Sequence, residues 1–473
     1  MRSRLFAAIC LLLQLAVLTP CIAATGAPAS GTVEFRGPEL TAGREAVPAG
    51  VVPATLSLDE AVAIGVLYNP QVTSSKEGVR LADALVEQAV SHLMPRLDVE
   101  SSRVTPVHPT VFQSPNSTWQ TTFRFSQPIY TGGAVSAGIK AARQFREGAV
   151  GSYDRTRQQI AFQVRAAYYA VLTAEEGVTV NQQVVDSAAE TLRVARLRYQ
   201  AGVAPQFDVL SAEARVARVE QGLIAARVAR DIAWAALSTV MGVSIPPGTQ
   251  LTTPRPASWE EQDFESLRIE AQANRPDLAA AQGQLAAARA QVAVAKAARQ
   301  PTVAASLTYS LVPKTTVSFG EPATDIVVNQ NSGFAVLSAS WSLFNGGQVE
   351  GEVRQAQAQV RQAEDAVTSV KQQIDLDVTS AYTSVSAARA QVAAAQKEVA
   401  QAQEAFRVAT IRYEEGVGTS VEILSAEADL ADAKTRLNQS IFGLNLAVAQ
   451  LDLALGRDAT TQPVFVPDER EGR

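Results

Sequence analysis

A 20-residue segment occurs twice in this 473-residue chain, and this duplication constrains the fold more than any other feature. The copies read LRYQAGVAPQFDVLSAEARV at 197–216 and IRYEEGVGTSVEILSAEADL at 411–430. They share R-Y, G-V and L-S-A-E-A at the same spacing, about 214 residues apart. Similarity of this kind within one chain predicts two structural repeats.

The repeat extends well beyond this segment. The matching pairs are Asn69-Pro70 with Arg275-Pro276 and Pro95 with Pro301, about 206 residues apart, and Gly132-Gly133 with Gly346-Gly347 and Met241-Gly242 with Leu455-Gly456, about 214 apart. The spacing changes only between Pro301 and Gly346, so the second copy has roughly eight extra residues there, as a surface loop tolerates. We therefore expect structural repeats over 56–263 and 264–456.

The N-terminal residues have the features of a secretory signal peptide. Arg2 and Arg4 precede an apolar run over 5–18, and small residues follow near Ala23 and Ala24. This order of basic, apolar and small residues is typical of an export signal. We therefore expect a signal peptide over 1–24. The composition also predicts an extended leader over 25–55 and a polar tail over 457–473.

Cys10 and Cys21 are the only cysteines, and both lie in the predicted signal peptide. The mature chain therefore has no disulfide framework. One alternative makes Cys21 a lipidated N-terminus, because the preceding Leu18-Thr19-Pro20 resembles a lipoprotein signal. Proline next to the cysteine is unfavourable for lipidation, so the preferred interpretation is a signal-peptide cysteine that is discarded.

Long coiled helices are the strongest structural signal. In both copies, mostly apolar or small residues recur at steps of four and three over more than five heptads, which is the seam of a coiled coil. The seam positions are Ile160, Val164, Ala167, Val171, Ala174, Val178, Asn181, Val185, Ala188, Leu192, Ala195 and Tyr199 in the first copy, and Ile374, Val378, Ala381, Val385, Ala388, Val392, Ala395, Val399, Ala402, Phe406, Ala409 and Tyr413 in the second. The helix from 134 to 199 would span roughly 100 Å. Shorter helices over about 70–94 and 207–241 nearly match it end to end. We expect a tall rod of two long helices, each flanked by a stacked pair of shorter ones.

Four stretches outside these helices alternate apolar and polar residues with period two, as half-buried strands do. They lie at about 97–106, 118–130, 302–312 and 334–344. Strands of about ten residues suit a tilted span of an outer membrane, although a soluble half-buried sheet would show the same alternation. No apolar run of 18 residues exists, so no transmembrane helix is expected.

A four-stranded sheet has two open edges. In lipid, the unpaired N–H and C=O groups at those edges would cost several kcal/mol each. Several chains must therefore contribute strands to one barrel. Two copies would give eight strands and three would give twelve, and this argument does not choose between them. If the strands close into a ring, the attached helices stand in a ring, which predicts a hollow tube.

The duplicated segment is predicted to form two helical-hairpin tips, at about 199–208 and 413–422. Gly202 and Gly416 would end the long helices in the left-handed conformation. Asp208 and Glu422 would lie in the first turns of the return helices, where an acid complements the positive helix end. A purely geometric interpretation stays open, in which Tyr, Gly and the acid simply form a tight turn.

Together these features resemble the TolC-like outer-membrane efflux family, the outer membrane factors. The resemblance rests on the doubled R-Y-x-x-G-V-x(5)-[ILV]-L-S-A-E pattern, the Asn69-Pro70 and Arg275-Pro276-Asp277-Leu278 motifs, and P-I-Y-T-G-G and S-L-F-N-G-G at the strand exits. It covers about 57–456. It implies a mainly α fold with a β-barrel portion, in which a homotrimer joins an α-helical barrel to a 12-stranded outer-membrane β-barrel, with four strands per chain.

The same resemblance implies a function. The protein would be the exit duct of a tripartite efflux or type I secretion system, in the outer membrane of a Gram-negative-type bacterium and extending into the periplasm. It would contact outer-membrane lipid and dock a periplasmic adaptor (membrane fusion) protein, which couples it to an inner-membrane RND, ABC or similar pump. The cargo could be small molecules, ions or polypeptides, and the sequence does not choose among them.

The family motifs also imply site residues. The adaptor-docking tips would be Tyr199, Gly202, Val203, Tyr413, Gly416 and Val417. The periplasmic gate would be Asp208, Ser211, Glu422 and Ser425, and Gly418 stands where some members have an arginine. The strand exits would be Gly132, Gly133, Gly346 and Gly347.

Other functions have little support in the residues. His92 and His108 are the only histidines and lie in different predicted elements, so no metal site is expected. No nucleophile elbow, phosphate-binding loop or cysteine cluster occurs, so we expect neither catalysis nor a cofactor. The basic residues are spread along the helices, which argues against a nucleic-acid partner. The competing hypothesis is a secreted structural or adhesive coiled-coil protein with a soluble β head.

Overall fold

The computed structural model describes residues 52–105, 118–254, 262–312, 315–319, 324–328, 331–415 and 417–457. The predictions for the signal peptide with Cys21, for most of the leader, for His108, for Gly416 and for nearly all of the tail lie outside these residues.

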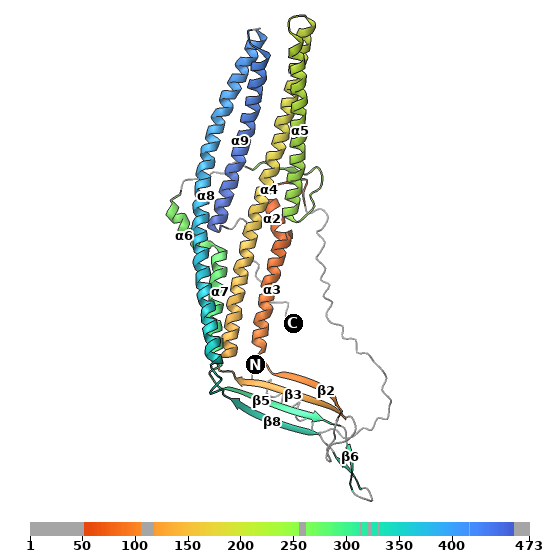
Figure 1. Ribbon diagram of the computed structural model, residues 1–473, viewed down its shortest axis with the longest axis vertical. Coiled ribbons are helices and arrows are strands. Elements are labelled where there is room, and N and C mark those ends of the chain that lie inside the picture. The colour runs from red at the N-terminus through yellow and green to blue at the C-terminus, as the bar shows by residue number, and fades with distance from the viewer. Residues whose placement is uncertain are drawn as a thin grey trace. The chain divides into compact units, whose positions relative to one another are not determined.

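Two long helices dominate the described chain, one from each copy of the repeat (Figure 1). α4 (Ala134–Gln200) and α8 (Gln348–Glu414) have 67 residues each, which corresponds to about 100 Å. Each is followed by a return helix of 36 residues, α5 (Gln206–Met241) or α9 (Ser420–Leu455). Each is also preceded by two shorter helices, which are α2 (Leu58–Tyr68) and α3 (Pro70–Ser91) in the first copy, and α6 (Phe264–Asn274) and α7 (Pro276–Ala297) in the second.

The heptad seam forms the core of each copy. Ile160, Val164 and Val171 of α4 are 0–1% exposed, and the corresponding positions in α8 are equally buried. Burying one such side chain stabilises the fold by about 1.5–3 kcal/mol. Tyr168 lies beside this seam, and its single O–H lies within hydrogen-bonding distance of two carbonyl oxygens, those of Leu56 (2.8 Å) and Thr252 (2.6 Å), and can donate to either. These contacts tie α4 to a short parallel sheet of β1 (Thr55–Leu56) and β4 (Gln250–Leu251), which the sequence did not predict.

The short helices break at the proline markers for a local reason. Pro70 and Pro276 occupy the first positions of α3 and α7, where a missing N–H costs no helical hydrogen bond. The preceding Asn69 accepts from the N–H of Gln71 (2.7 Å) and donates to the carbonyl of Val240 at the end of α5 (2.7 Å). The first pair of short helices is thereby fastened to the return helix.

The two copies pack against each other through close helix contacts. α7 of the second copy contacts both α4 and α8. A Cβ on Gly283 of α7 would lie 2.7 Å from the backbone N of Gly148 in α4, so only glycine permits this approach. The two repeats are therefore packed into a single unit.

The main sheet is antiparallel, in the order β2-β3-β5-β8 (Figure 1). Its strands are β2 (Arg96–Val104), β3 (Thr118–Tyr130), β5 (Thr302–Leu311) and β8 (Ser332–Ser340). A second hairpin of β6 (Thr315–Phe319) and β7 (Thr324–Val328) lies in the insertion of the second copy. This hairpin was not predicted from the sequence.

The last strand is shifted from its predicted position, and the other three agree with their predictions to within two residues. A strand was expected over 334–344, but β8 ends at Ser340. Ser340 pairs with Thr302, the first residue of β5, and Pro301 before it has no N–H to extend the ladder. Trp341 instead donates its indole N–H to the carbonyl of Arg299 (3.0 Å).

The main sheet has two chemically distinct faces. In antiparallel pairs, residues directly opposite each other share a face. Phe123 lies opposite Tyr309, and Phe125 lies opposite Leu307 on the same face. On the other face Asp98 lies opposite Arg124, and Arg124 lies opposite Thr308. One face is therefore mainly apolar. The other carries polar and charged residues, except that β8 adds Phe334 opposite Thr308 and Val336 opposite Ser306.

The sheet and the hairpin tips lie at opposite ends of the long helices (Figure 1). No described helix is both long enough and apolar enough to cross a membrane.

The C-cap glycines of the return helices have left-handed backbones, and we predict that they are intolerant of substitution. Gly242 has φ 71°, and its Cβ would lie 2.7 Å from the carbonyl oxygen of Tyr68. Gly242→Ala should therefore lower the free energy of unfolding by about 1–3 kcal/mol. Gly177→Ala, in an open stretch of α4, is the matched control and should be neutral or stabilising. Thermal unfolding of the purified protein measures both, and equal melting temperatures would contradict the packing described.

Candidate functional site at the helical hairpin tips

The first hairpin tip, residues 199–208, is closed by backbone hydrogen bonds. α4 ends at Gln200, and Gly202 follows with φ 73°, the left-handed conformation predicted for it. The N–H of Val203 donates to the carbonyl of Arg198 (3.0 Å). Asp208 lies in the first turn of α5, where its carboxylate complements the positive end of the helix.

The second tip, residues 413–422, uses a similar turn. The N–H groups of Val417 and Gly418 both donate to the carbonyl of Arg412, at 3.0 and 2.8 Å. The Thr419 side chain caps α9 by accepting from the N–H of Glu422 (3.3 Å). Glu422 occupies the first turn of α9, as Asp208 does in α5. Both predicted acids therefore lie at helix N-termini.

Each tip exposes one valine at the same repeat position. Val203 is 75% exposed and Val417 is 71% exposed. Most of the surface of both side chains is therefore in contact with solvent in the single chain. Two equivalent apolar side chains at one end of the helices are suited to contact another protein.

An arginine–tyrosine contact joins the two tips. Arg198 of α4 donates from Nη2 to the carbonyl of Tyr413 in α8 (3.1 Å), and its Cζ lies 4.2 Å from the centroid of the Tyr413 ring. This is a cation–π contact supported by a hydrogen bond. Tyr413 is consequently 8% exposed, whereas its repeat mate Tyr199 is 46% exposed.

The four predicted gate positions differ in exposure. Glu422 and Ser425 are exposed, whereas Asp208 and Ser211 are partly buried. The carboxylate of Glu422 forms an ion pair with Arg412 of its own hairpin, at 3.9 Å and with both side chains about half exposed. Exposed pairs of this kind contribute little to stability, so Glu422 keeps most of its freedom to interact elsewhere.

A buried carboxyl group lies further along α9 and was not singled out from the sequence. Glu427 is 6% exposed, and its Oε1 has no hydrogen-bond partner. Burial raises the pKa of Glu427, against a hydrogen bond from Ser187 of α4 and the charge of Arg215 of α5. The carboxyl therefore lies where the hairpin of the second copy packs on the hairpin of the first.

The four strand-exit glycines have a conformational role. Gly132 and Gly133 have φ values of 63° and 86°, and Gly346 and Gly347 have 63° and 88°. Such left-handed pairs let the chain turn sharply from β3 into α4, and from the segment after β8 into α8. A Cβ on Gly132 would also lie 2.8 Å from the carbonyl oxygen of Ala297.

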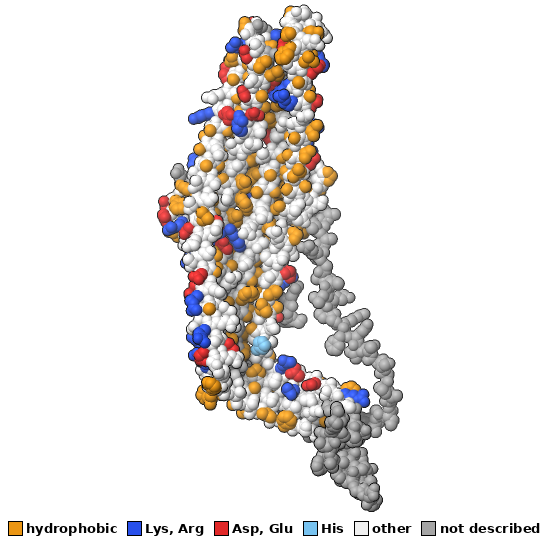
Figure 2. Space-filling model, in the orientation of Figure 1, with side chains coloured by type: hydrophobic (Ala, Val, Ile, Leu, Met, Phe, Trp, Pro, Cys, Tyr) orange, Lys and Arg blue, Asp and Glu red, His pale blue; other side chains and the backbone are white. Residues whose placement is uncertain are grey.

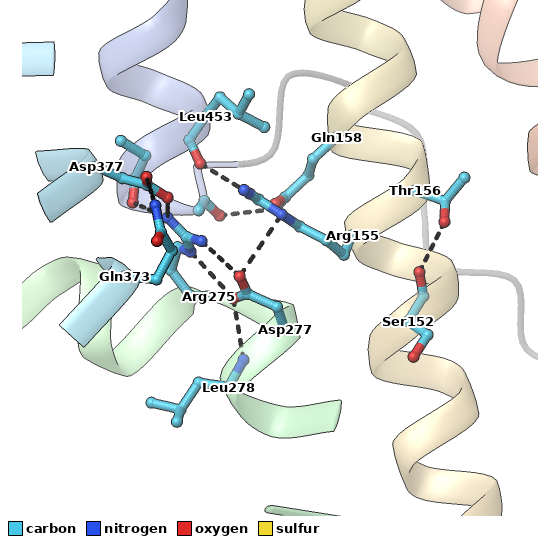
Figure 3. A network of polar contacts seen from close by, with 12 residues as sticks. Ser152, Arg155, Thr156, Gln158, Arg275, Asp277, Leu278, Gln373, Asp377 and Leu453 are labelled. Carbon is cyan, nitrogen blue, oxygen red and sulfur yellow. Dashed lines mark hydrogen bonds and ion pairs between the residues drawn. The ribbon is translucent and has the colours of Figure 1, made fainter. Parts of the chain in front are cut away.

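A central polar network joins α4, α7, α8 and the end of α9 at the junction between α6 and α7 (Figure 3). It consists of Arg155 and Gln158 of α4, Arg275 and Asp277 at the start of α7, and Asp377 of α8. Arg275 donates to Asp277 (Nε to Oδ1, 3.0 Å) and to Asp377 (Nη1 to Oδ2, 2.8 Å), and its side chain is 1% exposed. Arg155 and Gln158 donate to the carbonyls of Leu453 and Gly456, at 3.1 and 2.9 Å.

The charges in this network are balanced. Burial alone would raise the pKa of Asp277, but the hydrogen bond and charge of Arg275 outweigh it and hold the pKa below its usual value. The Asp277 carboxylate therefore stays ionised beside Arg275. The Arg275-Pro276-Asp277 motif quoted from the sequence is thus the anchor of four helices.

The match to a known protein family is divided between the two structural repeats. A family model described as outer membrane efflux protein matches residues 67–243 and 267–457, one segment in each repeat. The chain therefore belongs to the outer membrane efflux protein family, which confirms the resemblance to TolC-like outer membrane factors. Its place is the outer membrane of Gram-negative bacteria, and the family consists of channel proteins.

Individual relatives are distant. The cobalt-zinc-cadmium resistance protein CzcC of Cupriavidus metallidurans is 24% identical over 72% of this chain and 78% of its own length. Protein CyaE of Bordetella pertussis is 27% identical, but the match spans only 38% of each protein. Membership of this family argues against the alternative of a secreted structural or adhesive coiled-coil protein with a soluble β head.

The fold is also that of solved channels. A crystal structure of CusC superposes with a TM-score of 0.72 at 16% identity, over 84% of this chain and 92% of CusC. The outer membrane protein VceC of Vibrio cholerae gives a TM-score of 0.68 at 22% identity, over 84% of this chain and 96% of VceC.

We predict that the central network tolerates no loss of its buried cation. Arg275→Met leaves the carboxylates of Asp277 and Asp377 without their main partner, and should lower the free energy of unfolding by about 3 kcal/mol or more. Arg289→Met is the control, because the Arg289–Glu364 pair is about half exposed and should contribute less than about 1 kcal/mol. Thermal melting compares the two, and an equally mild effect would contradict the anchoring role.

We predict that Glu427 contributes less to stability at neutral pH than in acid. Its folded-state pKa is raised, so its contribution to stability is fully present below the ordinary value of 4.5 and is lost as pH rises through the folded-state pKa. Glu427→Gln should raise the free energy of unfolding by about 1 kcal/mol at pH 8. At pH 4 the difference from wild type should vanish.

The control for this prediction is Glu213→Gln, at the repeat mate of Glu427. Glu213 pairs with Arg196 (2.7 Å) and its side chain is 42% exposed. No gain in melting temperature at pH 8 is expected for this variant. A gain at Glu213 equal to that at Glu427 would show that burial is not the cause.

Proposed function

We propose that this chain is one third of an outer-membrane exit duct for a tripartite efflux or type I secretion system. The observation that carries the proposal is the two-faced sheet at one end of two helical hairpins. Its apolar face suits lipid, and its polar face suits a water-filled interior. The helices below would then form the wall of a periplasmic tunnel.

The open edges of the sheet support oligomerisation. β2 and β8 each have one hydrogen-bonded neighbour in the main sheet, so one edge of each strand is unpaired. In lipid those edges must be paired with another chain. Three chains with four strands each give the 12-stranded barrel that the family resemblance implies, in a homotrimer.

The hairpin tips are proposed to dock a periplasmic adaptor protein, which links the duct to an inner-membrane RND, ABC or similar pump. Val203 and Val417 supply exposed apolar contacts, Tyr199, Gly202 and Tyr413 lie beside them at the tips, and Gly416 is proposed as a further docking residue from the sequence motif. Asp208, Ser211, Glu422 and Ser425 are proposed to line the periplasmic gate. An acidic lining would favour cations.

The cargo is proposed only by class. CzcC is named for resistance to cobalt, zinc and cadmium, and the alkaline protease secretion protein AprF, 25% identical over 37% of this chain, is named for secretion of a protein. Small molecules, ions and polypeptides therefore remain the candidate passengers. The pump and adaptor would select among them.

Reconstitution of the purified protein in planar bilayers tests the proposal. Discrete channel openings with cation preference are expected, and Glu422→Gln should reduce that preference. A protein that never conducts in any of these bilayers would overturn the duct. Conductance with unchanged selectivity in Glu422→Gln would remove Glu422 from the gate alone.

We predict that charge at the two exposed valines blocks docking without disturbing the fold. Val203→Asp with Val417→Asp places carboxylates where an apolar contact is proposed, so adaptor co-purification and transport should fall by at least tenfold. Melting temperature and conductance should stay unchanged, because both positions are solvent-exposed. Ile269→Asp, at a 68% exposed position of α6 away from the tips, is the control and should retain transport. Full adaptor binding by the valine double variant would count against docking at the tips.

A further inference from the structure

The Arg198–Tyr413 contact joins the two tips, but the equivalent pair in the repeat, Arg412 and Tyr199, does not form such a contact among the described residues of this chain. Arg198 and Arg412 are repeat mates, and so are Tyr199 and Tyr413. Arg198 of the first copy covers Tyr413 of the second. Repeat symmetry therefore defines a second pairing, in which Arg412 of the second copy would cover Tyr199 of a first copy. Within this chain, Tyr199 is 46% exposed and the Arg412 side chain is 55% exposed.

The helices behind the tips show the same asymmetry. α9 of the second copy contacts α4 of the first. Phe442 of α9 packs on Tyr169 of α4, with ring centroids 6.2 Å apart. The repeat mate of Phe442 is Val228 of α5, which is 53% exposed. The position that is covered in α9 is therefore uncovered in α5.

Two polar positions follow the same rule. Glu427 of α9 is 6% exposed, whereas its mate Glu213 in α5 keeps a 42% exposed side chain. Asn445 of α9 is 4% exposed, whereas the side chain of its mate Asp231 is 68% exposed.

An exposed apolar stripe follows this surface of α5. Leu210, Ile224, Val228 and Ile232 are 53–64% exposed. Hydrophobic side chains also remain on the surface of the helical part in Figure 2. An apolar row of this length on a soluble helix face is suited to cover another helix.

We infer that a second copy of this chain completes the tip, with its Arg412 stacked on Tyr199 of this chain and its α8 lying along the exposed stripe of α5. This inference rests on the proposed oligomeric duct and deepens it. The contact within the chain and the contact between chains would then alternate around the ring. Each tip would be tied to both neighbours by one arginine–tyrosine pair.

Cross-linking tests the inference, because the only cysteines of the chain lie in its first 21 residues. With Cys21 replaced by alanine, Arg198→Cys with Tyr413→Cys places thiols at the contact within the chain. Tyr199→Cys with Arg412→Cys places them at the equivalent positions. A short bismaleimide is applied to both double variants in detergent, and the oligomeric state is measured by native mass spectrometry before the reaction.

The first variant calibrates the reagent. It should link within one chain, so its denatured mass stays that of a monomer, and protease fragments from the two copies stay joined. The second variant should give covalent dimers and trimers on a denaturing gel. The single variants Tyr199→Cys and Arg412→Cys should give neither product.

The outcomes separate this inference from the proposed function. If the calibration variant links and the protein is an oligomer, but the second variant stays monomeric or links within one chain, the inference is wrong and the duct stands. If native mass spectrometry finds single chains, both are wrong.

A double-mutant cycle on Arg412 and Tyr199 tests independently whether the two side chains interact. Arg412→Gln and Tyr199→Leu should each lower the temperature at which the oligomer dissociates, and the double variant should lose no more than the worse single variant. Arg412→Lys, which keeps the cation, should restore part of the loss. Additive losses, or no loss for Tyr199→Leu, would overturn the pairing.

Discussion

The unpaired backbone at the two edges of the β2-β3-β5-β8 sheet is the constraint on which the rest of this structure depends. The sheet has an apolar face with Phe123, Phe125 and Tyr309, and it stands at the far end of helices about 100 Å long. An apolar face that large requires lipid or protein cover, and lipid does not tolerate open edges. Closure with sister chains satisfies both demands. In the proposed oligomer, the helices attached to the strands would stand in the same ring and enclose a transport duct.

The duplication gives each chain two equivalent helical segments for the proposed ring. Asn69 donates to the carbonyl of Val240 in the first copy, and Arg275 lies against the carbonyl of Ala454 at the same place in the second. The two copies share this fastening but differ in charge, since Arg275 also gathers the carboxylates of Asp277 and Asp377. A neutral amide fastens one copy, and the buried guanidinium of the other bonds to residues of α7, α8 and α9. The equivalent helix junctions are therefore held by a neutral hydrogen bond in the first copy and by buried ion pairs in the second.

Much of the fold follows from local rules that a sequence exposes. The heptad seam, the prolines at the starts of α3 and α7, and the left-handed Gly202 are each dictated by near neighbours, so their patterns predict the helices and one tip. β8 ends earlier than its alternation suggests, because the ladder depends on Pro301 forty residues away. The Arg198–Tyr413 contact and the burial of Glu427 were missed for the same reason, since both arise only when two distant copies pack. The repeated R-Y dipeptide was the one sequence feature that pointed to the Arg198–Tyr413 contact. The burial of Glu427 had no such feature, because its repeat mate Glu213 is the same residue type and its side chain is 42% exposed.

Native mass spectrometry of the protein released from membranes in mild detergent tests the central claim most directly. If closure of the sheet requires sister chains, the intact particle has the mass of three chains and precipitates when detergent is removed. A stable single chain in detergent-free buffer would contradict it, because the sheet edges would then need no partner.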